Sequence, residues 1–378
     1  MRLLVLTHDI GKTAPGIVFE RLLSGLTKFC EIDVVTCNYT PSEDLDVKCV
    51  QLIHYPHIRI RLAKFLFVIF KTDIVSCILK RRVKINRDYD FVLSLCSSGF
   101  LFGVISGFYV SKRLNLKWGC YCVDAIPAPI GWSEDTPFFR ASKSFVKKYF
   151  SNLDFFAAVN EQMLKYEVSL FSPKNSLRTT YLVPPSLSEK IIQLPIICDK
   201  FCFLFAGNIY GMRKSKYVIE AFSKLVTKYE NIGLLFVGNI GQDTFGEISK
   251  LSADIKEKIE VYPRTTEIVP FYERASVLLD IDADLENDVY LSSKISTYLG
   301  YNRPIICESS EGTPSRSLLS GVESIIHCHH NAEEIQAAMS YTIEHYKDFD
   351  YSDRNELLHS FSSESIANHL YDAIQCIV

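Results

Sequence analysis

Three consecutive residues, Ser292, Ser293 and Lys294, are of types that bind phosphate. They follow an acidic run, LLDIDADLEND (278–288), which has the pattern of a buried strand that ends in carboxylates. We predict that a helix begins at Ser292 or Ser293, because a serine hydroxyl often caps the first amides of a helix. The remaining amides and the helix dipole would then bind the diphosphate of a nucleotide.

A second segment, FLFAGNIYGMRKSKYVIEAFSKL (203–225), offers another anion site. It predicts an apolar strand, a turn at Gly207 and Asn208, a basic loop with Arg213, and an amphipathic helix. Amides at such a turn and a guanidinium beside them both favour phosphate. Two anion sites in one half of the chain indicate one shared ligand.

The elements that must position these residues alternate along the chain, which favours parallel sheets covered by helices. We expect strands near 2–7, 32–36, 49–53, 91–95, 118–123, 155–159, 202–206, 233–237, 259–262, 277–281, 304–307 and 324–326. In the first half we expect helices near 15–28, 60–82, 99–113, 137–151 and 160–170. The pattern predicts two doubly wound α/β domains, with boundaries at 1–185 (first domain), 186–200 (proline-containing linker), 201–350 (second domain) and 351–378 (a final helix that packs back on the first domain).

Composition agrees with this organisation. A chain of 378 residues exceeds the usual size of one hydrophobic core, and a net charge of −3 disfavours bulk nucleic-acid binding. The twelve cysteines form no paired zinc-binding clusters, so we expect reduced thiols in a reducing cytoplasm. Neither a signal peptide nor an apolar run of membrane-spanning length is expected.

The two phosphate segments resemble the C-terminal domain of GT-B glycosyltransferases, most closely glycosyltransferase family 4 and its members in bacterial cell-surface polysaccharide and lipopolysaccharide O-antigen synthesis. VYLSSKISTYLGYNRPII (289–306) is similar to the family pattern PSKIYEYLAxGKPVI, and AGNIYGMR (206–213) to AGNIYxxR. The resemblance implies two Rossmann-like domains that face each other across a cleft. It also implies a nucleotide-diphosphate sugar donor, a glycan or lipid-linked glycan acceptor, retention of anomeric configuration, and no metal or other cofactor.

The resemblance also implies roles for individual residues. Arg213 matches the basic residue that clamps the donor diphosphate, which makes it a candidate catalytic residue. The expected donor-binding set is Gly11, Gly207, Asn208, Arg213, Tyr262, Ser293, Lys294 and Thr297. In the second domain the chain departs from the family at three positions: the two glutamate positions fall on Val289 and Thr297, and the second basic position falls on Asn208.

In the first domain, two residues follow predicted strands. Gly11 lies in THDIGKTAPG (7–16), which lacks the spacing of an ATP-binding phosphate loop and could equally be an ordinary turn. Asp124 stands where related enzymes carry a polar group near the transferred sugar, so it is a candidate catalytic residue. Val123 occupies the place of the family histidine, and Asp124 could instead cap a turn before Pro127.

Two tempting metal motifs are disfavoured. Asp280, Asp282 and Asp284 would share one face of a strand, but they lead directly into the phosphate segment. The run from His327 to His330 alternates in direction along a strand end, which seldom closes one tetrahedral zinc site. We therefore expect no metal site.

Residues 59–87 contain nine basic residues and one acidic residue, Asp73, around an apolar stretch. Such a segment can lie at the interface of an anionic membrane, or it can be an ordinary helix buried against the sheet. Lipid-linked acceptors in the resembling family favour peripheral membrane contact at the inner face of the cytoplasmic membrane.

The sequence therefore favours a hexosyl-type glycosyltransferase. A noncatalytic GT-B-like partner in glycan assembly remains open because of Val123 and Thr297, as does a nucleotide-sugar epimerase. A nicotinamide dehydrogenase is weaker, since no G-x-G-x-x-G follows the first strand.

Overall fold

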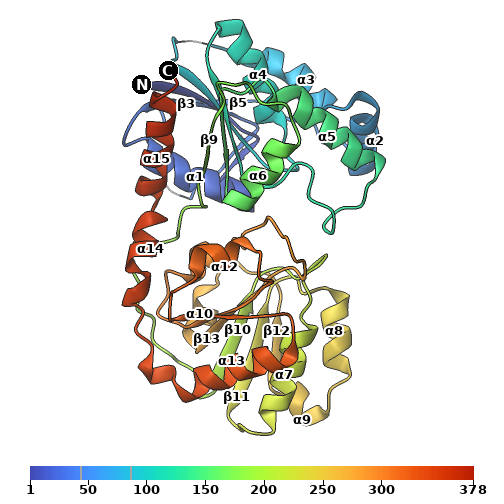
Figure 1. The fold of residues 1–378 in the computed structure, drawn as a ribbon, viewed down its shortest axis with the longest axis vertical. Coiled ribbons are helices and arrows are strands. Elements are labelled where there is room, and N and C mark those ends of the chain that lie inside the picture. Colours follow the sequence, from blue (N-terminus) through green and yellow to red (C-terminus); the bar gives the residue numbers. More distant parts are fainter. Residues whose placement is uncertain (43–44, 86) are drawn as a thin grey trace. The chain divides into compact units, whose positions relative to one another are not determined.

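The computed structural model describes residues 1–42, 45–85 and 87–378. These residues form two compact units (Figure 1). Met1–Pro185 together with Phe361–Val378 make the first unit, and Ser186–Ser360 make the second. Among the described residues, no helix combines the length and the apolar character needed to cross a bilayer.

The first unit contains a parallel sheet of seven strands in the order β5-β3-β1-β6-β7-β8-β9. The strands are β1 (Arg2–Leu6), β3 (Glu31–Thr36), β5 (Cys49–Leu52), β6 (Phe91–Cys96), β7 (Trp118–Cys122), β8 (Phe155–Ala158) and β9 (Arg178–Tyr181). A separate two-stranded sheet consists of β2 (Asp9–Ile10) and β4 (Asn38–Tyr39). The six predicted strands are confirmed. The sequence does not predict β9, because this edge strand reads RTTY and is largely exposed.

The helices of the first unit are α1 (Ala14–Leu26), α2 (Ile60–Phe70), α3 (Ile74–Leu79), α4 (Phe102–Leu114), α5 (Pro137–Phe150), α6 (Glu161–Ser169) and α15 (Ser363–Gln375). The expected single helix over 60–82 is wrong. Lys71 adopts the left-handed conformation (φ 50°), which ends α2, and the Asp73 carboxylate accepts hydrogen bonds from two backbone amides that begin α3. Lys80–Arg82 continue as a 3₁₀ turn.

The final helix, α15, packs along α1 within the first unit (Figure 1). Gly25 permits the close approach, because a Cβ there would lie 2.1 Å from the carbonyl oxygen of Ser363. Lys28 pairs with Glu364 at 2.5 Å, and Phe29 stacks on Tyr371. The preceding α14 (Asn355–Ser360) belongs to the second unit.

The second unit contains a parallel six-stranded sheet in the order β12-β11-β10-β13-β14-β15. Its strands are β10 (Phe201–Ala206), β11 (Ile232–Val237), β12 (Ile259–Tyr262), β13 (Val277–Ile281), β14 (Ile305–Glu308) and β15 (Ile325–Cys328), as the apolar runs predict. Its other helices are α7 (Lys216–Val226), α8 (Gly241–Ser249), α9 (Ala253–Lys256), α10 (Val269–Arg274), α11 (Ile295–Tyr298), α12 (Pro314–Leu319) and α13 (Ala332–Glu344).

Helix α7 shows why this layer forms. It buries Val218, Ile219, Phe222 and Leu225, whose spacing places them on one face of the helix. That face joins the core over β10 and β11, and α13 packs beside it (Figure 1). Burial of each large side chain stabilises the unit by about 1.5–3 kcal/mol.

The stretch 186–200, which the sequence marks as a linker, belongs to the second unit. The buried Arg303 guanidinium donates to the carbonyl oxygens of Leu194 (3.1 Å) and Pro195 (2.9 Å). Ile192 also forms a backbone bridge with Tyr301. These contacts hold the segment against the second unit although its sequence has no regular period.

Candidate active site

The second unit gathers two carboxylates and two cations at the carboxyl end of β13. Asp280, in β13, is buried, and its Oδ1 accepts hydrogen bonds from the Ser292 hydroxyl (2.8 Å) and from Lys294 Nζ (2.9 Å). Lys294 Nζ also lies 2.9 Å from the Ser292 oxygen. Because ligands of parallel sheets bind beyond the carboxyl ends of the strands, these groups stand where a ligand is expected.

Arg213 reaches the same place from the loop between β10 and α7. An isolated antiparallel bridge joins Arg213 to Ala283, and the amide of Asp284 donates to the carbonyl oxygen of Met212 at 3.2 Å. The guanidinium Nη2 then lies 3.9 Å from Oδ1 of buried Asp282. Backbone pairing therefore fixes the loop that carries the cation.

Gly207 completes the arrangement, because it leaves room for the lysine stem. A Cβ at Gly207 would lie 2.9 Å from Lys294 Cδ, and Lys294 Nζ stands 5.1 Å from the centre of the Phe205 ring. The structure thus brings together three predicted residues, Gly207, Arg213 and Lys294. We name the group of Asp280, Asp282, Arg213, Lys294 and Ser292 the cation cluster.

Burial controls the electrostatics of the cation cluster. It raises the pKa of Asp282 to about 7, the neighbouring Asp280 acts in the same direction, and Arg213 opposes both. Burial also lowers the pKa of Lys294, an effect that Asp280 opposes. Near neutral pH Asp282 is therefore divided between its neutral and ionised forms, which weakens the negative charge that faces Arg213.

The predicted hydroxyl-capped helix start is wrong. Helix α11 comprises only Ile295–Tyr298, its N-cap residue is Lys294, and no side chain caps it. Ser292 gives its hydroxyl to Asp280 instead, while Ser293 is exposed and its carbonyl oxygen accepts from Ser296. The Ser292 hydroxyl donates to Asp280 and accepts from Lys294 Nζ, so its oxygen is turned toward this charged pair rather than toward the first amides of α11.

Three other predicted donor residues also lie in the second unit. Asn208 follows Gly207, and its Oδ1 accepts from the amide of Asn239 at 3.3 Å. Thr297 lies half-buried within α11. Tyr262 ends the edge strand β12, where its hydroxyl contacts Glu260 (2.5 Å) and Arg274 (3.1 Å) in an ion-pair network of their own. Their roles toward a donor stay predictions.

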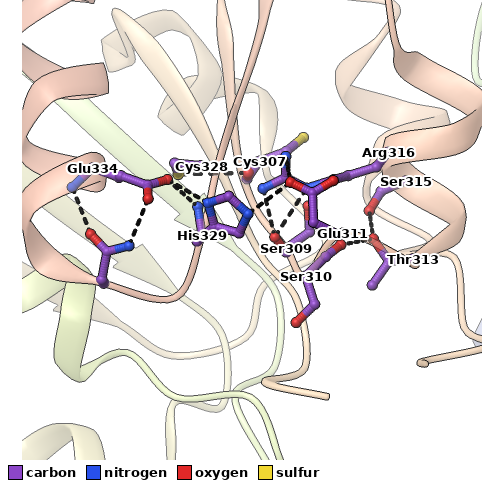
Figure 2. Close-up of polar contacts among 11 residues, drawn as sticks. Cys307, Ser309, Ser310, Glu311, Thr313, Ser315, Arg316, Cys328, His329 and Glu334 are labelled. Atoms are coloured by element: carbon purple, nitrogen blue, oxygen red, sulfur yellow. Dashed lines mark hydrogen bonds and ion pairs between the residues drawn. The ribbon is translucent and has the colours of Figure 1, made fainter. Parts of the chain in front are cut away.

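A loop after β14 extends the polar surface at the strand ends (Figure 2). Glu311 lies between His329 (2.8 Å) and Arg316 (3.3 Å), and Arg316 also donates to the carbonyl oxygen of Ser309. At the other end of the loop, the Ser315 hydroxyl lies 3.4 Å from Oδ2 of Asp282. The sequence of this loop carries no distinctive motif, because its serines and glycine resemble an ordinary turn.

Two histidines of the run, His329 and His330, contact different acids. His329 contacts Glu334 (2.7 Å) as well as Glu311, and His330 Nδ1 lies 2.8 Å from buried Glu308 (Figure 2 shows the His329 contacts). Burial raises the pKa of Glu308 to about 7, against the opposing effect of His330. In the part of the chain that the structure describes, no three metal-ligating side chains converge on one point.

The first-unit candidates stand after β1 and β7. Gly11 has φ +87°, and a Cβ there would lie 2.1 Å from the carbonyl oxygen of Thr40, so the loop requires glycine. The buried Asp9 fixes this loop by accepting from both the amide (2.8 Å) and hydroxyl (2.7 Å) of Thr13. Burial raises the pKa of Asp124 to about 6, while a backbone hydrogen bond at Ser98 lowers it.

The sequence matches no protein-family model and no curated protein, whereas solved structures match its fold. Anabaena HepE in complex with UDP has a TM-score of 0.69 and 9% identity, and the match covers 100% of both chains. The apo lipopolysaccharide outer core galactosyltransferase WaaB has a TM-score of 0.64 and 12% identity over 100% of both chains. A putative UDP-N-acetylglucosamine 2-epimerase from Listeria monocytogenes has a TM-score of 0.55 and 13% identity, over 99% of this chain and 95% of its own.

These likenesses agree with the strand orders and with the helices that cover each sheet. The predicted fold class is confirmed: the chain has the GT-B fold, built from two Rossmann-like α/β domains.

Proposed function

We propose that this protein is a glycosyltransferase that moves a hexose-type sugar from a nucleotide-diphosphate donor to a hydroxyl of a glycan or lipid-linked glycan. Its place would be the synthesis of cell-surface polysaccharide, as in the family 4 enzymes that it resembles. The observation that carries the proposal is the cation cluster, in which Arg213 and Lys294 stand at the carboxyl end of β13.

The cluster suits the departure of a nucleoside diphosphate. As the bond from sugar to phosphate breaks, negative charge grows on the leaving group, and preorganised cations stabilise it. Arg213 offers a planar set of donors and Lys294 a compact charge, both held by buried acids rather than by mobile contacts. We propose that these two side chains stabilise the negative charge of the departing diphosphate without a metal ion.

We also propose a role for Asp124 beside the transferred sugar, a stereochemical outcome and a class of donor. Asp124, with its pKa raised to about 6, would hydrogen-bond the transferred sugar. Retention of the anomeric configuration follows from the family resemblance. HepE has been solved in complex with UDP and with UDP-glucose, and WaaB is a galactosyltransferase, which supports a hexose donor with a uridine base.

We further propose peripheral contact with the cytoplasmic membrane surface through residues 59–87. Within α2, Leu62 (50% exposed), Phe65 (60%) and Ile69 (53%) form a stripe on one helical face, because they are spaced by three and four residues. An exposed apolar stripe beside nine basic residues matches the interface of an anionic bilayer.

A nucleotide-sugar epimerase is the second candidate, because the Listeria monocytogenes epimerase shares the fold. A noncatalytic GT-B-like partner protein in glycan assembly is the third candidate. The three differ in products: a transferase consumes donor only with acceptor or slowly with water, an epimerase converts the donor sugar without acceptor, and a partner protein does neither.

The test supplies UDP, GDP and dTDP sugars with a membrane extract that contains lipid-linked glycans, and follows the sugar by mass spectrometry. Transfer by the wild type that falls strongly in Arg213→Ala supports the transferase. Lys216→Ala is the matched control, because Lys216 is an exposed cation three residues away. Epimerised donor without glycan product would instead establish the epimerase.

A further inference from the structure

The sheet of the second unit loses its regular pairing at one point, between β10 and β13. Strand β10 pairs with β11 along its whole length, from Phe201 to Ala206. Within the described part of the chain, its ladder to β13 covers Phe203 and Leu204 and ends there. Strand β13 itself continues to Ile281 and stays paired with β14. The hydrogen-bond ladder between these two neighbouring strands therefore stops before either strand ends.

The Tyr298 hydroxyl lies where this ladder stops. The Gly207 amide donates to Val237 in β11 at 2.8 Å, and backbone groups alternate in direction along a strand, so those of Ala206 face β13. The Ala206 amide donates to the Tyr298 oxygen at 2.9 Å. The Tyr298 hydroxyl donates in turn to the Ala206 carbonyl oxygen at 3.3 Å, a weaker contact. One phenol thus serves both backbone groups of Ala206.

The strand register places this contact beside the cation cluster. Leu204 is level with Leu278, so Ala206, two residues further along, would be level with Asp280. Asp280 is the buried carboxylate that accepts from Lys294 Nζ at 2.9 Å. The ladder therefore stops at the level of the cation cluster, where the phenol takes the place of a backbone partner in β13.

Helix α11 contacts the end of β10 and the turn that follows it. Tyr298 is the last residue of this helix, and its amide donates to the Lys294 carbonyl oxygen at 2.8 Å, so the two residues stand about one turn apart. Tyr298 contacts Ala206, while the Lys294 stem passes Gly207, where a Cβ would lie 2.9 Å from Lys294 Cδ. The hydroxyl of Tyr298 therefore helps to set the position of the Gly207 turn relative to the Lys294 ammonium.

The phenol is held firmly in its place. Tyr298 is fully buried, and its ring packs edge to face on Tyr272 at 6.1 Å between ring centres. Burial raises the pKa of Tyr298 well above its usual value, so the hydroxyl keeps its proton. A neutral phenol can accept and donate at once, as the two groups of Ala206 require. Phenylalanine would fill the same space but would leave Ala206 without this partner.

We infer that Tyr298 is a positioning residue for phosphate binding. Its hydroxyl fixes the end of β10 relative to α11, so that the backbone amides of the Gly207 turn and the Lys294 ammonium reach the same diphosphate. This role rests on the proposed function, because the donor diphosphate is the ligand that the two elements would share. Tyr298 acts through Ala206 and Lys294 rather than on the ligand itself.

The test is calorimetric titration of the full-length protein with UDP and with UMP, which lacks the second phosphate. Tyr298→Phe should lower the preference for UDP over UMP about tenfold, the factor that one lost hydrogen bond to a charged group gives. A general loss of stability would weaken both nucleotides alike. Tyr272→Phe is the matched control, because it removes the hydroxyl of the neighbouring buried tyrosine and should leave the preference unchanged.

A measurement without nucleotide tests the contact at the strand end. Hydrogen exchange of the Ala206 amide, followed by NMR after selective labelling of alanine, should be at least about tenfold faster in Tyr298→Phe than in the wild type. Equal exchange rates would overturn the inference. In the wild type alone, an Ala206 amide that exchanges as fast as in an unfolded chain would refute the contact, even if the variant failed to fold.

The two titrations separate this inference from the proposed function. Nucleotide binding with the same preference for UDP in Tyr298→Phe and wild type would overturn the positioning role alone, as would an equal loss of preference in Tyr272→Phe. Binding of neither nucleotide to the wild type would overturn the proposed function and the positioning role together.

Discussion

The two units present different chemistry at equivalent places, the carboxyl ends of a parallel sheet. In the second unit, buried Asp280 and Asp282 hold Lys294 and Arg213 in fixed positions. In the first unit, the corresponding edge lines an apolar cavity with a polar end at His8. Two sheets of the same layered type thus present a charged cluster at one edge and a largely apolar cavity at the other, because strand ends and the loops that follow them supply the side chains.

The largest effect should come from breaking the charge balance of the second unit. Lys294→Met keeps most of the side-chain length but leaves Asp280 buried without its cation, which should cost about 3–5 kcal/mol of unfolding free energy. Urea denaturation measures this loss. The double variant Lys294→Met/Asp280→Asn should recover much of the stability, and no recovery would show that lysine packing, not charge, matters.

Arg213→Ala tests whether the charged edge of the second unit takes part in catalysis. Removal of a preorganised donor to developing charge should lower turnover by about 10²–10³-fold. The effect on stability should be smaller, because Arg213 lies 3.9 Å from Asp282 rather than in a close pair. Steady-state sugar transfer measures the change. Turnover within twofold of the wild type, alongside Lys216→Ala, would remove Arg213 from the mechanism.

The buried acid of the same site predicts a pH dependence. The pKa of Asp282 is raised to about 7 in the folded protein by burial and by Asp280 and Asp288, against Arg213 and Lys294. Between about pH 4 and 7 the unfolded state therefore holds fewer protons than the folded state, so stability falls as pH rises through this window.

Asp282→Asn should remove the part of the pH dependence that Asp282 causes. Between pH 4.5 and pH 7.5 that part is on the order of 3 kcal/mol of unfolding free energy. The measurement is the difference in unfolding free energy between wild type and variant at pH 4.5 and pH 7.5, which cancels the titration of Glu308 and other acids. An identical pH slope in both proteins would mean that Asp282 is ionised throughout the range.

The smallest effect concerns the outer face of α2. Ile69→Ser should weaken binding to vesicles of phosphatidylglycerol by about tenfold, because one exposed isoleucine leaves the bilayer interface. Ile197→Ser is the control, since Ile197 is 62% exposed in the second unit. Vesicle sedimentation measures both. Equal weakening in the two variants, or no preference for phosphatidylglycerol over phosphatidylcholine, would contradict a specific membrane face.

Much of the layout follows from sequence, because apolar strands and amphipathic α7 carry their period locally. The break between α2 and α3 does not, since it depends on the left-handed Lys71 and the cap at Asp73. Edge strand β9 also lacks an apolar pattern. In the cluster, residue types suggest Arg213 and Lys294 as phosphate ligands, but their acid partners arise only when the chain folds.

Thermal stabilisation by UDP, GDP, dTDP and CMP, compared between the wild type and Arg213→Ala, decides whether the cation cluster binds a diphosphate. One nucleoside diphosphate should raise the wild-type melting temperature by several degrees, as expected at about 100 times its Kd, and Arg213→Ala should abolish the rise. The absence of a response to every nucleotide, or an equal response in the variant, would contradict a diphosphate site at the cation cluster.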